Sequence, residues 1–114
     1  MAKALITVVE TASFKAAAKG VLTAEETSGL INDLAANPES GVVIVGGSGI
    51  RKVRVSAKGK GKSGGARVIY YYHDNSIPIF LLTVFAKNEK DNLSDAEKAA
   101  LAKVARAIKE TYNG

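Results

Sequence analysis

Three strand-like segments follow one another in the second half of the chain, and they constrain the fold more than any other feature. Apolar and basic residues alternate over Arg51–Ser56, Arg67–Tyr72 is rich in Val, Ile and Tyr, and Ile77–Ala86 is apolar on both faces. Alternation is typical of a half-buried strand, and an uninterrupted apolar run is typical of a central strand. Because the links between the segments are short, they favour an antiparallel meander.

Capping motifs predict where two helices begin. Thr23 and Ser94 each start an S/T-x-x-E motif that ends at Glu26 and Glu97, respectively, and such motifs form reciprocal hydrogen bonds at a helix N-terminus. We therefore expect a single α+β domain over residues 1–114, a small antiparallel sheet with an N-terminal helical hairpin and a C-terminal helix. The other expected elements are a strand over Lys3–Val9, a helix over Glu10–Lys19, a helix from Thr23 to Asn37-Pro38 and a strand over Gly41–Val45.

The composition excludes several classes of chemistry. The chain has 114 residues, of which 46% are hydrophobic, so one domain with a real core is expected. It has no cysteine and a single histidine, His73, which excludes disulfides, thiol catalysis, Cys-based zinc sites and His-rich metal sites. No metal or other cofactor is expected. The apolar runs are too short for a membrane span and no secretory leader is visible, so we expect a cytoplasmic protein.

Positive charge is concentrated in one third of the chain. No acidic residue lies between Ser40 and His73, and this stretch contains seven basic residues, although the whole chain has a net charge of only +5. Such a block indicates a polyanionic partner, nucleic acid first. An acidic protein partner and a merely solvated basic loop are the alternatives. The basic residues are Arg51, Lys52, Arg54, Lys58, Lys60, Lys62 and Arg67.

A loop of alternating Lys and Gly separates two of the predicted strands. Residues 59–64 match G-x-G-x-x-G, but a strand follows them, whereas a dinucleotide-binding fingerprint must open a helix. A P-loop would need a glycine at Ser56, so this motif fails as well. We interpret the loop as flexible, with Lys58, Lys60 and Lys62 presenting mobile ammonium groups to phosphates. The alternative is an exposed hairpin tip that lysine keeps soluble.

Other candidate groups have simpler interpretations. In a strand, Tyr71 faces away from Tyr70 and Tyr72, and packing is the expected role of each. His73 beside Asp74 is expected to be a surface residue of a turn. Any phosphodiester chemistry would then depend on Lys and Arg, which can hold a phosphate and stabilise developing negative charge.

Three stretches of the sequence together resemble a known family. They are GIRKVRV at 49–55, KGKGKSGGARVIYY at 58–71 and LLTVFAKNE at 81–89, and they resemble the RelE/HigB superfamily of bacterial toxins, nearest the HigB branch with a GKGKxGG loop. The resemblance covers about 41–94. It implies a RelE-like fold and a toxin of a type II toxin–antitoxin system, which enters the ribosomal A site and cuts mRNA. In such enzymes the RNA 2′-OH attacks the phosphodiester without a metal.

The resemblance also implies partners and site residues. The partners are a cognate antitoxin, expected to be a helix-turn-helix protein, and the ribosome with its mRNA; operator DNA is contacted only through the antitoxin. Lys52, Arg54, Arg67 and Lys87 correspond to the catalytic basic residues, with Arg67 contacting the scissile phosphate. The expected RNA-binding residues are Arg51, Lys58, Lys60, Lys62 and Asn88.

Two positions depart from the family pattern. Asn88 stands where some relatives have arginine, and Ser94 stands where some have an aromatic acid/base residue. The proton of the 2′-OH would then be handled by a loop lysine or by Lys87. The alternative functions are a non-catalytic basic RNA- or DNA-binding module and a degenerate toxin that only binds its antitoxin.

Overall fold

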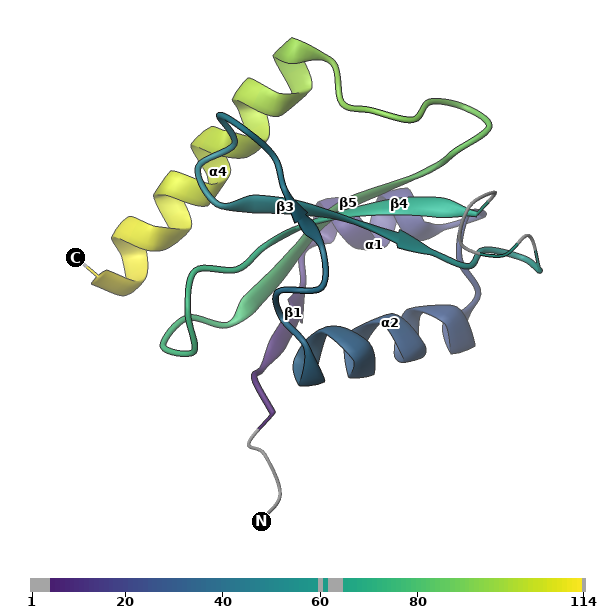
Figure 1. Cartoon of the computed structure of the whole chain (residues 1–114), viewed down its shortest axis with the longest axis horizontal. Coiled ribbons are helices and arrows are strands. Elements are labelled where there is room, and N and C mark those ends of the chain that lie inside the picture. The colour runs from purple at the N-terminus through teal and green to yellow at the C-terminus, as the bar shows by residue number, and fades with distance from the viewer. Residues whose placement is uncertain (1–4, 60, 62–64, 114) are drawn as a thin grey trace.

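A computed structural model of the chain describes residues 5–59, 61 and 65–113, which form a five-stranded mixed sheet with helices on both faces (Figure 1). The strands lie in the order β1-β5-β4-β3-β2. In chain order the elements are β1 (Val8–Glu10), α1 (Ala12–Ala18), α2 (Ala24–Ala36), β2 (Val42–Val43), β3 (Ile50–Val55), β4 (Ala66–Tyr71), β5 (Ile79–Ala86) and α4 (Asp95–Asn113).

The predicted antiparallel meander is confirmed for β3, β4 and β5. The sheet is larger than the meander, because β1 joins the other edge of β5 in parallel and β2 adds to β3. The N-terminal strand covers only the end of the range expected for it, and Ile79 N donates to Thr7 O (2.9 Å) just before it. Residues 3 and 4 of the expected strand lie outside the described residues.

The helices begin where the capping motifs predicted. Thr23 Oγ1 accepts from Glu26 N (3.1 Å), and a Glu26 carboxylate oxygen accepts from Thr23 N (2.9 Å). Ser94 and Glu97 form the same box at the start of α4, with distances of 3.1 and 2.8 Å. Thr11 caps α1 by accepting from the main chain three residues later. These local hydrogen bonds satisfy donors that every helix N-terminus leaves unpaired.

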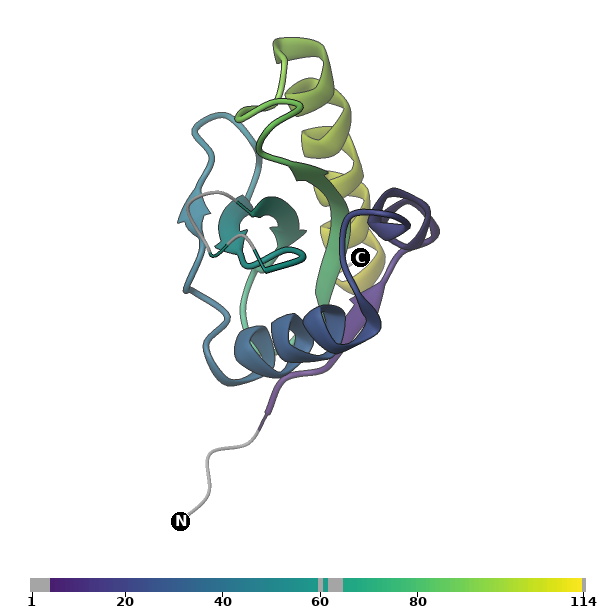
Figure 2. The ribbon, with the colours of Figure 1, turned by 90° about the vertical axis from the view of Figure 1, so that its right-hand side faces the viewer.

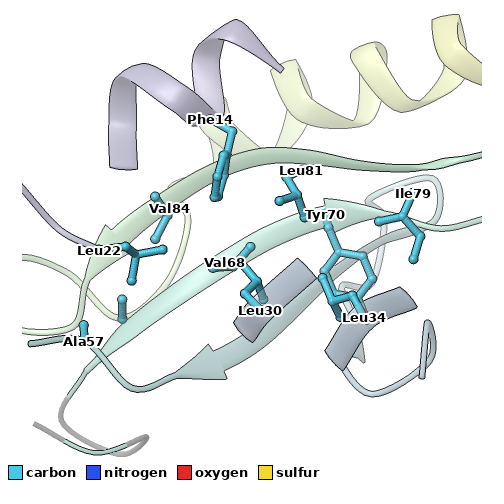
Figure 3. Close-up of a cluster of buried hydrophobic side chains, with 11 residues drawn as sticks. Phe14, Leu22, Leu30, Leu34, Ala57, Val68, Tyr70, Ile79, Leu81 and Val84 are labelled. Carbon is cyan, nitrogen blue, oxygen red and sulfur yellow. The ribbon is translucent and has the colours of Figure 1, made fainter. Parts of the chain in front are cut away.

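Helices α1 and α2 cover one face of the sheet, and α4 covers part of the other (Figures 1 and 2). On the first face, Phe14 of α1 and Leu30 and Leu34 of α2 pack against Val68 and Tyr70 of β4 (Figure 3). The core residues of the second face are Ile50, Ile69, Tyr71, Ile77, Leu82, Phe85 and Ala105. The predicted alternation of the tyrosines is therefore confirmed, and Tyr70 is a packing residue as expected.

The hydroxyl group of Tyr70 ties the end of α2 to the edge of the sheet. It donates to Pro38 O (2.7 Å) and accepts from Gly41 N (2.8 Å), and burial raises the pKa of this hydroxyl. A Cβ at position 41 would lie 2.7 Å from the Tyr70 ring, so only glycine fits there. This contact holds β2 beside the basic strand β3.

Candidate nucleic-acid interface

Three of the four predicted catalytic residues lie together on the sheet face that carries α4. Arg54 of β3 is directly opposite Arg67 of β4, and Arg67 is opposite Phe85 of β5. Lys52, two residues before Arg54, pairs with Ile69 on the same face. The strand alternation thus placed Lys52 and Arg54 correctly, and the β3–β4 register adds Arg67 to them.

The arginine pair is electrostatically unfavourable without an anion, because like charges directly opposite in a sheet destabilise it. Arg67 is only 2% exposed, although it is charged. Among its contacts, Nε lies 3.2 Å from a carboxylate oxygen of Asp91, and Nη1 donates to Ala66 O (3.2 Å). The carboxylate of Asp91 is itself 57% exposed, so it meets the guanidinium from the solvent side.

The segment of residues 87–94, here called the strap, joins β5 to α4 (Figure 1). Its Asp91 is the source of this carboxylate. Its Asn92 accepts a hydrogen bond from Lys52 Nζ (2.6 Å). Its Lys90 pairs with Glu97 of α4 and places Nζ 5.0 Å from the centre of the Phe85 ring. The hydrogen bond from Lys90 and those of Ser94 lower the pKa of Glu97 to about 2.

Lys87 and Asn88 lie at the exposed start of the strap. Lys87 N donates to Gly65 O (3.0 Å), which places it beside the base of the Lys/Gly loop. Lys58 and Asn88 share the lining of a small cavity of about 180 Å³ there, together with Glu89. The backbone of Lys58 is fixed by Glu26, whose carboxylate accepts from Lys58 N (2.6 Å). Lys60 and Lys62 lie outside the described residues.

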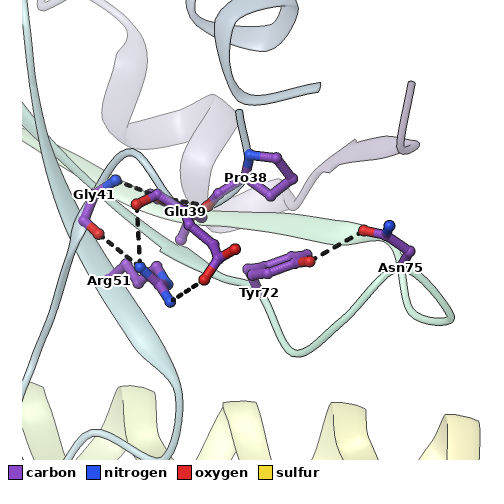
Figure 4. Close-up of polar contacts among 7 residues, drawn as sticks. Pro38, Glu39, Gly41, Arg51, Tyr72 and Asn75 are labelled. Atoms are coloured by element: carbon purple, nitrogen blue, oxygen red, sulfur yellow. Dashed lines mark hydrogen bonds and ion pairs between the residues drawn. The ribbon is translucent and has the colours of Figure 1, made fainter. Parts of the chain in front are cut away.

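Arg51 is separated from the other basic residues because it points to the opposite face of the sheet. Its Nη1 donates to Gly41 O (2.8 Å) and Glu39 O (3.3 Å), and Nη2 lies 3.7 Å from the Glu39 carboxylate (Figure 4). Its guanidinium also lies 6.0 Å from the centre of the Tyr72 ring. Arg51 thus holds the chain before β2 in place. It lies apart from Lys52, Arg54 and Arg67, which form the basic face of the sheet.

The contacts of the strap with the basic face were not predicted. The signal available in the sequence was a cluster of polar residues, Lys90, Asp91 and Asn92, between the last strand and the cap of the last helix. Ser94 is the N-cap that the sequence predicted. His73 is exposed in the turn between β4 and β5, where its Nε2 lies 3.5 Å from a carboxylate oxygen of Asp74. Within the described ranges, no group of three or more His, Cys, Asp or Glu side chains is arranged to hold a metal ion.

These features define a small α+β protein with a basic patch on one face of its sheet. Comparison with protein families gives a match over residues 37–113 to the RelE toxin of the RelE/RelB toxin–antitoxin system. The chain therefore belongs to the RelE toxin family, and an antitoxin is its expected partner. The matched range begins at the end of α2 and contains every strand that forms the basic face. No helix in the described parts is both long and apolar enough to span a membrane.

Proposed function

We propose that this toxin is a ribosome-dependent mRNA endoribonuclease. The observation that carries the proposal is the position of Lys52, Arg54 and Arg67 on one sheet face, two of them directly opposite each other. Three cations within one cross-strand patch suit a phosphate that becomes more negative in the transition state. Membership of the RelE family supports the same conclusion, and the GKGKSGG loop supports assignment to the HigB branch.

The proposed reaction is attack of a 2′-oxygen of the message on the adjacent phosphorus. The P–O5′ bond breaks, so the products are a 2′,3′-cyclic phosphate and a 5′-hydroxyl end. Arg54 and Arg67 stabilise the charge that develops on the phosphate oxygens, and Lys52 holds the neighbouring part of the backbone. The proton of the 2′-hydroxyl passes to solvent water, and the leaving O5′ takes up a proton, for which the exposed Lys87 is the proposed donor. Binding in the ribosomal A site would align the message for this attack.

The Lys/Gly loop is proposed to hold RNA phosphates. Replacing Lys58, Lys60 and Lys62 together by glutamine should weaken binding to RNA and reduce the slope of log K against log salt. The reduction should be roughly one unit for each phosphate contact that is lost. A matched control variant removes three exposed positive charges elsewhere on the protein. They belong to Lys15 of α1, Lys19 just after α1, and Lys103 of α4. Equal slopes in the two variants would leave the loop without a role in binding.

The chemistry is tested with purified protein, translating ribosomes and a short message. We expect new fragments with 5′-hydroxyl ends, which must be phosphorylated before ligation, and no fragments when the nucleotide before the cut carries a 2′-deoxy substitution. Fragments with 5′-phosphate ends, or cleavage of the deoxy-substituted message, would contradict attack by the 2′-oxygen.

A second function is supported by one observation, the capping role of Ser94 at the position where some relatives have an aromatic acid/base residue. In this second function the protein is a degenerate toxin or a basic RNA- or DNA-binding module, which would bind antitoxin and RNA without cutting the RNA. The same assay distinguishes the two, because this protein would bind translating ribosomes and leave the message intact. In either case we propose a helix-turn-helix antitoxin as partner, with operator DNA bound through it.

A further inference from the structure

We propose that the strap closes the basic face in the free protein, with the carboxylate of Asp91 at the position that an RNA phosphate takes in the complex. This inference rests on the proposed function, since it describes how the same site is regulated. It predicts that the protein exists in a closed form, which cannot offer Arg67 to RNA, and an open form, which can.

The burial of Arg67 is the first observation behind this proposal. A residue that contacts a phosphate must be reachable, yet Arg67 is 2% exposed. Asp91 approaches its Nε from the solvent side at 3.2 Å, and the Asp91 carboxylate remains 57% exposed. A carboxylate and a phosphate offer the same kind of oxygen acceptors to a guanidinium. The Asp91 carboxylate therefore occupies the approach that a phosphate would need.

The second observation is that neighbouring residues of the strap engage two different site residues. Asp91 contacts Arg67 on β4, and the adjacent Asn92 accepts from Lys52 Nζ on β3 (2.6 Å). Displacing the strap would break both contacts at the same time. Because Arg54 and Arg67 are directly opposite each other, loss of the Asp91 carboxylate makes an open face without ligand electrostatically less favourable. An RNA phosphate supplies the charge that the departing carboxylate removes.

The third observation is that the charged anchor of the strap is exposed, whereas Leu93, at the far end of the strap, packs against the core beside α4. Lys90 pairs with Glu97, but these side chains are 37% and 42% exposed, and exposed ion pairs contribute little to stability. Opening at this anchor leaves the capping box of α4 in place, because Ser94 makes its own hydrogen bonds with Glu97. Residues 90–92 can thus move while Leu93 stays against the core and the helix that follows stays folded.

Binding of a short RNA with 2′-deoxy groups, which cannot be cut, tests the closed form. The apparent dissociation constant equals the intrinsic value divided by the fraction of open protein, so loosening the strap strengthens binding. We expect Asp91→Asn to tighten binding by about three- to tenfold. Asp95→Asn removes the same charge four residues later, at the exposed first residue of α4, and should change binding much less. Weaker binding by Asp91→Asn, or equal effects of both variants, would overturn the proposal.

A second measurement needs no RNA and no activity. Hydrogen exchange of the Arg67 side-chain Nε–H, followed by NMR, should be much slower than that of the exposed Arg106. Lys90→Met removes the charged anchor and keeps an apolar stem beside Phe85, so both it and Asp91→Asn should speed exchange at Arg67. Exchange at Arg67 as fast as at Arg106 in the wild-type protein would refute the closed strap. Protected exchange in a protein that never cuts RNA would instead refute the proposed function and leave the strap standing.

Discussion

Replacing Arg67 by alanine separates the proposed catalytic role of this residue from its role in the fold. The side chain is 2% exposed, and its three methylene groups are buried in the sheet beside Phe85. Alanine keeps Cβ, so at about 0.8 kcal/mol for each of the two methylene groups removed, the variant loses about 1.6 kcal/mol of apolar burial. The variant also removes the electrostatic repulsion between Arg67 and Arg54, which stabilises the fold by up to about 1 kcal/mol. The net loss of stability is therefore about 0.6–1.6 kcal/mol.

A loss of this size leaves a domain with ordinary stability folded, because small domains unfold at a cost of about 5–15 kcal/mol. We expect the melting temperature of Arg67→Ala to fall by roughly 2–10 °C. Cleavage on the ribosome should fall much further, by about 10²–10³-fold, as when one donor to a developing negative charge is removed. Thermal melting, soluble yield and growth after induction measure the two effects separately.

Arg67→Lys is the control for charge alone. It keeps the cation and most of the buried stem but loses the planar fork of donors, so we expect intermediate cleavage with a smaller change in melting temperature. A folded Arg67→Ala variant that cuts as fast as the wild type would refute the catalytic assignment. An Arg67→Lys variant as inactive as Arg67→Ala would show that the guanidinium geometry, rather than the charge, is required.

Three further predictions use other parts of the structure. Arg54→Ala removes an exposed side chain, so cleavage should fall at least about tenfold while unfolding free energy changes by less than about 1 kcal/mol; a fully active variant would remove Arg54 from the site. The pKa of Glu97 is lowered to about 2 in the folded protein, from 4.5 in the unfolded chain. The ionised form of Glu97 therefore stabilises the fold above about pH 4.5, and this stabilisation is lost as the pH falls towards 2. Glu97→Gln should flatten melting temperature against pH in that window, and an unchanged profile would contradict this. Tyr70→Phe leaves Gly41 N and Pro38 O without their hydrogen-bond partner. The free energy of unfolding measured with denaturant should therefore fall by about 1–3 kcal/mol, with cleavage retained at low temperature. An unchanged free energy of unfolding would show that the hydroxyl does not stabilise the fold.

Local patterns predicted much of the fold because each is decided by neighbouring residues. The capping boxes at Thr23 and Ser94 depend on hydrogen bonds three residues apart, and the meander depends on period-2 runs joined by short links. Strand alternation likewise placed Lys52 and Arg54 on one face. These inferences needed no information about distant parts of the chain.

Long-range contacts escaped prediction for a physical reason. The pairing of β1 with β5 joins segments about 70 residues apart, and three residues of strand carry no signal of their partner or direction. The face to which Arg51 points follows from the same alternation that placed Lys52. Its hydrogen bond to Gly41 O, however, depends on the path of the chain before β2. The strap has no periodicity, so nothing in its sequence indicated that Asp91 would meet Arg67.

The central claim is that this toxin cuts translated mRNA through Arg67, and mapping RNA ends in cells tests it most directly. Wild-type protein and Arg67→Ala would be induced in bacteria without the antitoxin, together with a translated and an untranslated copy of one message. The account predicts new 5′ ends in the translated copy alone, made by the wild type and lost in Arg67→Ala. Ends in both copies would contradict dependence on the ribosome, and no new ends with both proteins folded would contradict the proposed nuclease.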